Sequence, residues 1–291
     1  EEINLNNWQG FAKSEDGTVQ ISFTIPFSVI KKKKEEALEE LTKDITVSGF
    51  RKGKAPKEKV TAQIPENTLL ETTLQKLLPS LFADAVTQHK IKAATYPKFE
   101  VVKATENSDW QIRATTCELP DIKLDDYKQL LLRSKSTKIW VPGKDDKKQK
   151  EPSREEKEQE IIKILLETIN INVPKVLIEE EVNSRLSNLL ARIEKLGLSL
   201  EGYLASIGKT SESLRQEYEK QARETIALTL ILNKIVAEEK LSVSQSEIDK
   251  ILHSSVKDEK DYQKLNTPEQ RRLIEAMLSR RSALDYLTTL A

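Results

Sequence analysis

Cysteine and histidine are nearly absent from this chain, which has one Cys and two His in 291 residues. A tight zinc site needs about four nitrogen or sulfur ligands, and a disulfide needs a second thiol. We therefore expect no metal, no structural disulfide and no thiol relay. We also expect no other cofactor. The single thiol, Cys117, ends a predicted strand with no His near it in the sequence, so we predict that it packs in a core.

Glycine and aromatic residues are also scarce, with 8 Gly and 5% Phe, Trp and Tyr. Glu, Lys and Leu are abundant instead, which is typical of long helices and disfavours a sandwich, a barrel or a Rossmann enzyme. The 47 Lys and Arg balance the 47 Asp and Glu, so the chain has no global electrostatic bias. Its length suggests two domains, since a domain usually has about 100 to 200 residues.

Long apolar runs are missing as well. No run approaches the roughly 20 apolar residues that span a bilayer, and the first residues lack a basic-then-apolar secretory pattern. We expect a cytoplasmic protein that does not contact membranes. Because the sequence begins at Glu1 and not at Met, a removed signal peptide stays open.

The first part of the chain predicts a small α+β domain, with a small antiparallel sheet and helices. Apolar residues alternate with polar ones from Val19 to Ile25, as in a strand with one buried face. Helical spacing follows over 30–45 and again over 67–88, where Pro79 is expected to kink or split the helix. Two further strands are predicted over 99–102 and 110–115. We place this domain at residues 1–127.

A lysine run, Lys31–Lys34, lies on the first predicted helix. Lys31 and Lys32 precede Glu35 and Glu36 by four residues, which predicts local charge pairing on a solvated helix face. Binding of an anionic surface by these lysines is a secondary hypothesis.

Residues 128–152 end in a charged, polar stretch and are predicted to be a linker, and residues 153–291 are predicted to be all α. Capping-box patterns start three helices, at Ser153 with Glu156, Ser244 with Glu247, and Thr267 with Gln270. Another helix is predicted from Pro174 to Gly197, and one of about thirty residues begins near Thr210. This C-terminal domain should form long helical arms.

The most informative segment is Gly-Phe-Arg-Lys-Gly-Lys-Ala-Pro at 49–56. Gly49 and Gly53 permit tight turns, and Pro56 is suited to begin a helix. The stretch 51–59 has five Lys or Arg and one acid, which favours docking at a local anionic site such as an RNA backbone. On loop physics alone, it is equally open that Phe50 folds into its own domain and the cations are ordinary surface charges.

This octet, after an alternating strand and a Lys/Glu-rich helix, resembles the ribosome-binding loop of trigger factor, the bacterial nascent-chain chaperone family. The resemblance continues over residues 15–127, which end in Glu-Leu-Pro-Asp-Ile-Lys-Leu-Asp-Asp-Tyr. Residues 153–290 resemble the family's helical C-terminal domain more loosely, at 170–178, 202–204 and 208–210. An FKBP-type prolyl isomerase domain of about a hundred residues usually separates the two parts, and about 25 residues stand there in this chain.

The resemblance implies a chaperone that holds clients without ATP and without isomerase activity, and that is not an enzyme. Phe50, Arg51 and Lys52 would bind ribosomal protein and rRNA at the exit of the large ribosomal subunit, in a loop shaped by Gly49, Gly53 and Pro56. Helical arms would offer apolar side chains to unfolded nascent polypeptides. The client-binding candidates are Leu186, Leu190 and Tyr203. Whether free molecules form a homodimer through the exposed cradle stays open.

Two alternatives compete with this interpretation. One is a free or periplasmic chaperone similar to SurA, which the octet disfavours and a removed signal peptide would favour. The other is a prolyl isomerase enzyme, for which 128–152 leaves no room.

Overall fold

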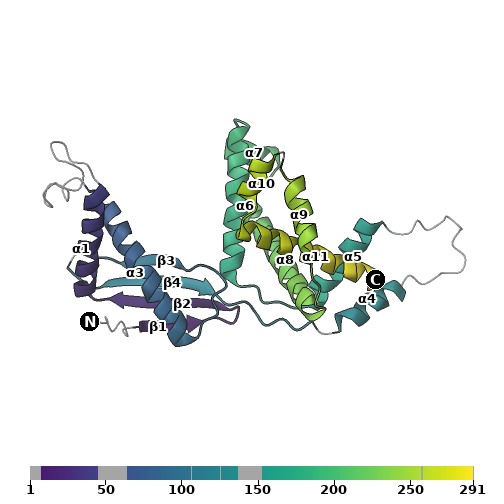
Figure 1. The fold of residues 1–291 in the computed structure, drawn as a ribbon, viewed down its shortest axis with the longest axis horizontal. Helices are drawn as coiled ribbons and strands as arrows, with labels where there is room; N and C mark the ends of the chain where they lie inside the picture. The colour runs from purple at the N-terminus through teal and green to yellow at the C-terminus, as the bar shows by residue number, and fades with distance from the viewer. Residues whose placement is uncertain are drawn as a thin grey trace, which may run out of the picture. The chain divides into compact units, whose positions relative to one another are not determined.

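The computed structural model describes residues 8–44, 64–105, 107–124, 126–136, 153–256 and 258–290. Contacts divide the chain into two units, Glu1–Leu119 with Pro174–Val176, and Pro120–Val173 with Leu177–Ala291. The first unit contains a small antiparallel sheet with helices, and the second is helical in its described residues (Figure 1). The predicted fold class, α+β followed by all α, is confirmed.

The sheet has four antiparallel strands in the order β1-β2-β4-β3. Their bounds are β1 Trp8–Lys13, β2 Thr18–Ile25, β3 Lys98–Lys103 and β4 Trp110–Cys117. Alternate side chains of β2, beginning with Val19 and Ile21, are buried on one face, as the sequence pattern predicts. Cys117 at the end of β4 is fully buried, in agreement with a packing role.

Two helices, α1 (Phe27–Asp44) and α3 (Glu66–His89), cover the apolar face of the sheet (Figure 1). Ile30 of α1 and Leu81 of α3 lie in one core with the inward residues of β2 and β4. The expectation that Pro79 could split its helix is wrong, because α3 runs unbroken through it. Pro79 itself is exposed, and the helix around it is stabilised by burial of Leu77, Leu78 and Leu81.

β1 was not predicted, because its sequence does not alternate and its pairing with β2 contains an irregularity between Trp8 and Gly10. The turn that joins the two strands is built by Asp16, whose carboxylate accepts bonds from the Thr18 N–H and hydroxyl. Gly17 follows with φ +88°. Its carbonyl accepts the Glu118 N–H at 2.9 Å, which brings two backbone segments close together.

The second unit is built from helices in its described residues. Their bounds are α4 Tyr127–Ser136, α5 Arg154–Thr168, α6 Lys175–Lys195, α7 Leu200–Ser206, α8 Ser211–Glu238, α9 Gln245–Ser254, α10 Glu259–Leu265 and α11 Pro268–Leu290. Of these, α7 and α10 are short helices of seven residues each. α11 packs against α4, α5, α8 and α9, so it is the central helix of this unit.

The helix starts follow the sequence signals. Ser153 and Ser244 form complete capping boxes, and Thr267 accepts the Gln270 N–H at 3.2 Å. Thr210 caps α8 as predicted, and α6 ends before Gly197, whose φ is +69°.

The sequence predicts a domain boundary at residue 127 and a linker over 128–152, whereas the contacts divide the two units between Leu119 and Pro120. Leu124, Tyr127 and Leu131 are buried in the helical core of the second unit, and α4 occupies the first part of the predicted linker. The apolar residues of α4 adjoin a charged run, which hid its helical pattern from the sequence analysis. The functional division into a ribosome-binding domain, a linker and a chaperone domain stays a prediction.

The Gly17 turn allows a direct test of the first unit. Gly17→Ala places a Cβ 2.5 Å from the Glu118 carbonyl oxygen at φ +88°. We expect a loss of about 1–3 kcal/mol in the stability of this unit. Gly197→Ala is the matched control, because its φ of +69° carries similar backbone strain but no atom lies within 4 Å. Hydrogen exchange of each unit measures both losses, and equal losses would contradict the close approach at Gly17.

Candidate functional site

The predicted ribosome-binding residues, Phe50, Arg51 and Lys52, lie outside the described residues. The same holds for the loop-shaping residues Gly49, Gly53 and Pro56. Their roles stay predictions. The structure does describe the two chain segments from which residues 45–63 start and to which they return.

These two segments form a stem. Ala37 of α1 is fully buried against Ile64 and Leu69, and Leu38 and Leu41 pack on the same cluster. An ion pair between Glu40 and Lys76 also links α1 to α3. The packing holds α1 and the start of α3 together (Figure 1). Residues 45–63 therefore lie between two helices that contact each other.

The lysine run beside this stem is paired differently from the prediction. The ion pair that forms joins Lys33 to Glu36 at 2.7 Å, three residues apart, and not Lys31 or Lys32 to the glutamates four residues on. Within the described part of the chain, no carboxylate lies within ion-pair distance of Lys31 or Lys34. Part of the positive charge on α1 is therefore available to an outside partner.

The three client-binding candidates have different environments. Leu186 is partly buried and packs on the cluster formed by Val182 of α6 and Ala222 of α8. Leu190, one turn further along α6, is 46% exposed, whereas Tyr203 of α7 is half-buried. Of the three, Leu190 has the side chain most accessible to a client.

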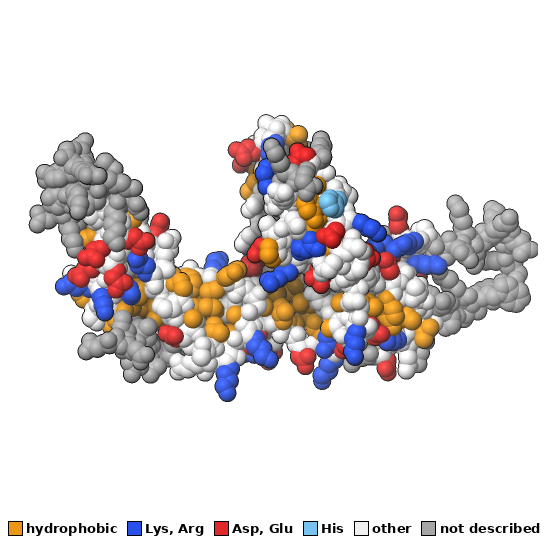
Figure 2. Space-filling view, viewed as in Figure 1, with side chains coloured by type: hydrophobic (Ala, Val, Ile, Leu, Met, Phe, Trp, Pro, Cys, Tyr) orange, Lys and Arg blue, Asp and Glu red, His pale blue; other side chains and the backbone are white. Residues whose placement is uncertain are grey.

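Further exposed apolar residues near the end of α6 were missed by the sequence analysis. Leu196 and Leu198 flank Gly197 and are 68% and 52% exposed, and Ile207 at the end of α7 is also exposed. An apolar residue on each side of a helix-ending glycine was the available signal. We call Leu190, Leu196, Leu198 and Ile207 the α6–α7 apolar group. Figure 2 shows hydrophobic side chains reaching the surface among charged ones.

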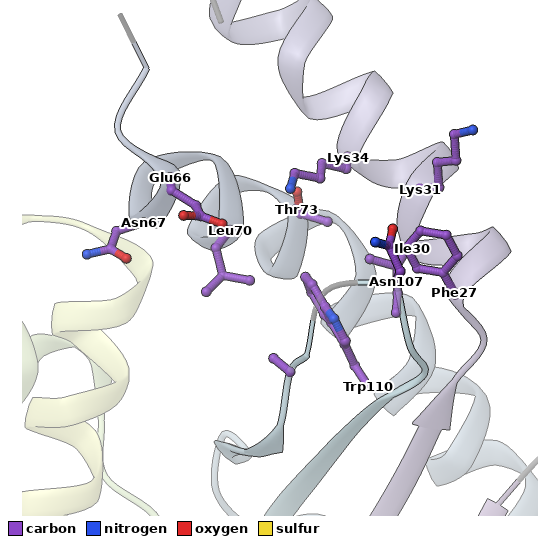
Figure 3. Close-up of a pocket in the computed structure, with 11 residues that line it drawn as sticks. Phe27, Ile30, Lys31, Lys34, Glu66, Asn67, Leu70, Thr73, Asn107 and Trp110 are labelled. Atoms are coloured by element: carbon purple, nitrogen blue, oxygen red, sulfur yellow. The ribbon is translucent and has the colours of Figure 1, made fainter. Parts of the chain in front are cut away.

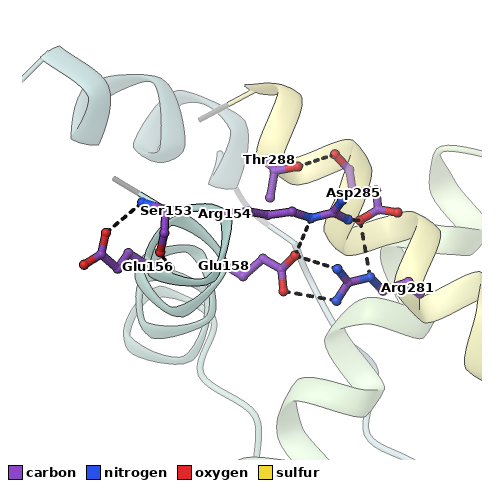
Figure 4. A network of polar contacts seen from close by, with 7 residues as sticks. All are labelled: Ser153, Arg154, Glu156, Glu158, Arg281, Asp285 and Thr288. Atoms are coloured by element: carbon purple, nitrogen blue, oxygen red, sulfur yellow. Dashed lines mark hydrogen bonds and ion pairs between the residues drawn. The ribbon is translucent and has the colours of Figure 1, made fainter. Parts of the chain in front are cut away.

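Charged networks fix the helices of the second unit. Glu158 of α5 accepts bonds from Arg154 at 3.0 Å and from both terminal nitrogens of Arg281 on α11 at 2.8 and 3.1 Å (Figure 4). Asp285 pairs with both arginines. The Arg154 hydrogen bond, with help from Arg281, holds the pKa of Glu158 below its usual range although partial burial opposes the shift.

A second network is centred on Glu239, which follows α8. Its carboxylate accepts the Tyr127 hydroxyl at 3.2 Å and the Tyr286 hydroxyl at 2.9 Å, and it pairs with Lys128. The Lys128 bond lowers the pKa of Glu239, whereas burial, together with the nearby carboxylate, raises the pKa of Tyr127 to about 12. Both networks link helices and line none of the cavities described in this structure, so they stabilise packing.

The described residues contain no group of three or more His, Cys, Asp or Glu placed to hold a metal ion. Among the helices in the described ranges, none is long and apolar enough to cross a bilayer. The site features that remain are the stem of the 45–63 segment and the exposed apolar residues of the helical unit.

Two family models together match the chain from the small α+β unit to the end of the helical unit. The model for bacterial trigger factor protein matches residues 11–146, and the model for the trigger factor C-terminus matches residues 144–289. The chain belongs to the trigger factor family.

Individual relatives match one part of the chain. The trigger factor of Streptococcus mutans is 32% identical over 128 residues, which are 44% of this chain and 30% of the relative. The Lactococcus lactis subsp. cremoris trigger factor is 34% identical over 128 residues, which are again 44% of this chain and 30% of the relative. That of Limosilactobacillus reuteri is 30% identical over 139 residues, 48% of this chain and 31% of the relative. The match thus spans about a third of the length of these curated relatives.

One solved structure is similar over nearly the whole chain. It comes from a study of promiscuous substrate recognition in the folding and assembly activities of the trigger factor chaperone. The TM-score is 0.60 at 12% identity, with 96% of this chain and 99% of that chain covered. This likeness supports the fold.

Proposed function

We propose that this chain is a ribosome-associated, ATP-independent chaperone that holds unfolded nascent polypeptides in the cytoplasm. The observation that carries the proposal is the Gly-Phe-Arg-Lys-Gly-Lys-Ala-Pro octet within a segment whose two ends are joined by the α1–α3 stem, in a member of the trigger factor family.

The docking half of the proposal rests on the octet and its stem. A loop ordered at both ends loses less conformational freedom on binding than a free terminal segment, which favours affinity. Arg51 and Lys52 would contact rRNA or an acidic ribosomal protein, and Phe50 would fill a small apolar recess. Gly49, Gly53 and Pro56 would set the shape of the loop tip.

Replacement of Phe50, Arg51 and Lys52 by alanine should abolish co-sedimentation with purified ribosomes at moderate salt. Arg51→Ala alone should weaken binding and reduce the salt slope by about one unit, because one fewer phosphate is neutralised. Lys32→Ala/Lys98→Ala removes two exposed cations elsewhere in the first unit and is the control. If all variants sediment like the unchanged protein, or if neither the unchanged protein nor any variant sediments, the free SurA-like chaperone becomes the better account.

The holding half of the proposal rests on exposed apolar side chains. The α6–α7 apolar group presents three leucines within nine residues, 190 to 198, each at least 46% exposed. Dispersed apolar contacts are weak and tolerant of sequence, so a client can bind and leave without nucleotide hydrolysis. Leu190 and Tyr203 remain candidates for client contact, whereas Leu186 is mainly an internal packing residue.

Changing Leu190, Leu196 and Leu198 to serine should reduce suppression of client aggregation severalfold, since three apolar side chains are removed from the client-facing surface. Light scattering of a chemically denatured client after dilution measures the effect. The matched control changes Val102, Leu119 and Leu132 to serine, which are 50%, 52% and 53% exposed outside this group. Equal loss in both triple variants would show that general surface hydrophobicity, and not the α6–α7 apolar group, holds the client.

We also propose that the chain has no prolyl isomerase activity and is not an enzyme. The 25 positions from 128 to 152 are too few for a packed domain of about a hundred residues, and α4 takes up the first of them. Homodimerisation of free molecules through apolar helix surfaces remains compatible with the proposal.

A further inference from the structure

A cavity of 510 Å³ lies in the first unit between α1, α3 and the connection from β3 to β4 (Figure 3). Ile30, Leu70 and Trp110 form its apolar floor. Its volume falls in the range of small-ligand sites, about 300–1,000 Å³. Polar side chains from three places also line it. They are Lys31 and Lys34 of α1, Glu66 and Asn67 of α3, and Asn107 of the connection from β3 to β4.

The cavity walls are fixed by hydrogen bonds. The Asp109 carboxylate accepts the Phe27 N–H at 2.9 Å, which ties the start of α1 to the residue before Trp110. Ser108 donates from its N–H and its hydroxyl to the Thr105 carbonyl, and Asn107 within this turn has φ +56°. These bonds fix Phe27, Ser108 and Asp109 beside the described lining of the cavity.

The charge around the cavity is uneven. Lys33 and Lys76 are neutralised by Glu36 and Glu40, but Lys31 and Lys34 have no described carboxylate partner. In Figure 3 Lys34 points across the cavity toward α3, Lys31 lies at the α1 rim with its ammonium group turned outward, and Glu66 lies on the α3 side. An anionic group would thus be attracted to the α1 side of the cavity.

We propose that this cavity binds a nucleoside phosphate, with the base over Ile30, Leu70 and Trp110. The phosphate would lie at Lys34 and at Lys31, whose exposed side chain would turn toward it. The ligand is a free nucleotide or a nucleotide of single-stranded RNA, and the RNA source rests on the ribosome docking proposed above. Asn67 and Asn107 each offer a donor and an acceptor for a base edge.

An acidic peptide fits the same cations less well. A carboxylate side chain would satisfy the lysines but has no flat apolar body to fill the floor of a 510 Å³ cavity. A nucleotide supplies both parts in one ligand, since every base has an apolar face next to a charged phosphate.

Trp110 provides the probe. In full-length protein with Trp8→Phe and Trp140→Phe, it is the remaining tryptophan of the three in the chain. Its fluorescence would be titrated with adenosine 5′-monophosphate, a six-nucleotide single-stranded RNA, inorganic phosphate and a six-residue glutamate peptide. We expect a saturable change with the first two, at lower concentration than with phosphate, and none with the peptide.

Lys31→Gln/Lys34→Gln should weaken nucleotide binding at least tenfold, with circular dichroism confirming the fold. The RNA salt slope should fall by about 0.7 for each phosphate that is no longer neutralised. The control Lys32→Gln/Lys98→Gln removes the same charge at exposed positions outside the cavity and should change binding less than twofold. Asn107→Gly keeps the positive φ and should weaken the nucleotide but not inorganic phosphate.

If the RNA binds saturably and the mononucleotide does not, the cavity is an RNA site. If the mononucleotide binds and the RNA does not, it is a free-nucleotide site. Binding of the glutamate peptide with no nucleotide response, equal weakening in the control, or no response to any ligand overturns the proposal. The titration contains no ribosomes, so its failure leaves the docking proposal standing. A loss of ribosome binding in the Phe50, Arg51 and Lys52 variant with an unchanged titration separates the two sites.

Discussion

The packing of α1 against α3 is the constraint on which the first unit depends. Ile30 and Leu81 bury the apolar face of the sheet, and further along the same helices Ala37 and Leu69 close the stem of the 45–63 segment. One helix pair therefore performs two tasks. It completes a core that the sheet cannot complete alone, and it holds together the two chain segments between which residues 45–63 lie.

The helical unit is held together by other contacts, and several of its leucines remain exposed. Its interior is closed by α11, and the Glu158 and Glu239 networks link neighbouring helices through charged hydrogen bonds. Helices fixed in this way need not bury every leucine. Leu190, Leu196 and Leu198 can stay at the surface without loss of the fold, where an emerging polypeptide could reach them.

Much of the fold could be predicted from the sequence where a pattern was local. β2 alternates, Ser153 and Ser244 begin helices with capping boxes, and Gly197 ends α6. β1 lacks alternation and depends on the Asp16–Gly17 turn, so it was missed. Which leucines of α6 are buried was harder to predict, because Leu186 and Leu190 share one helical stripe. Contact with α8 partly buries Leu186 and leaves Leu190 exposed. The cavity beside Trp110 joins residues far apart in sequence, and no local pattern indicates it.

The central claim is that the segment joined by the α1–α3 stem is where this chaperone meets the ribosome. Hydrogen exchange of the intact protein, with and without a saturating amount of ribosomes, tests that claim residue by residue without any substitution. The account predicts slower exchange over residues 45–63 when ribosomes are present, with the strands of the sheet unchanged. Unchanged exchange in that segment, or protection restricted to the helical unit, would contradict it.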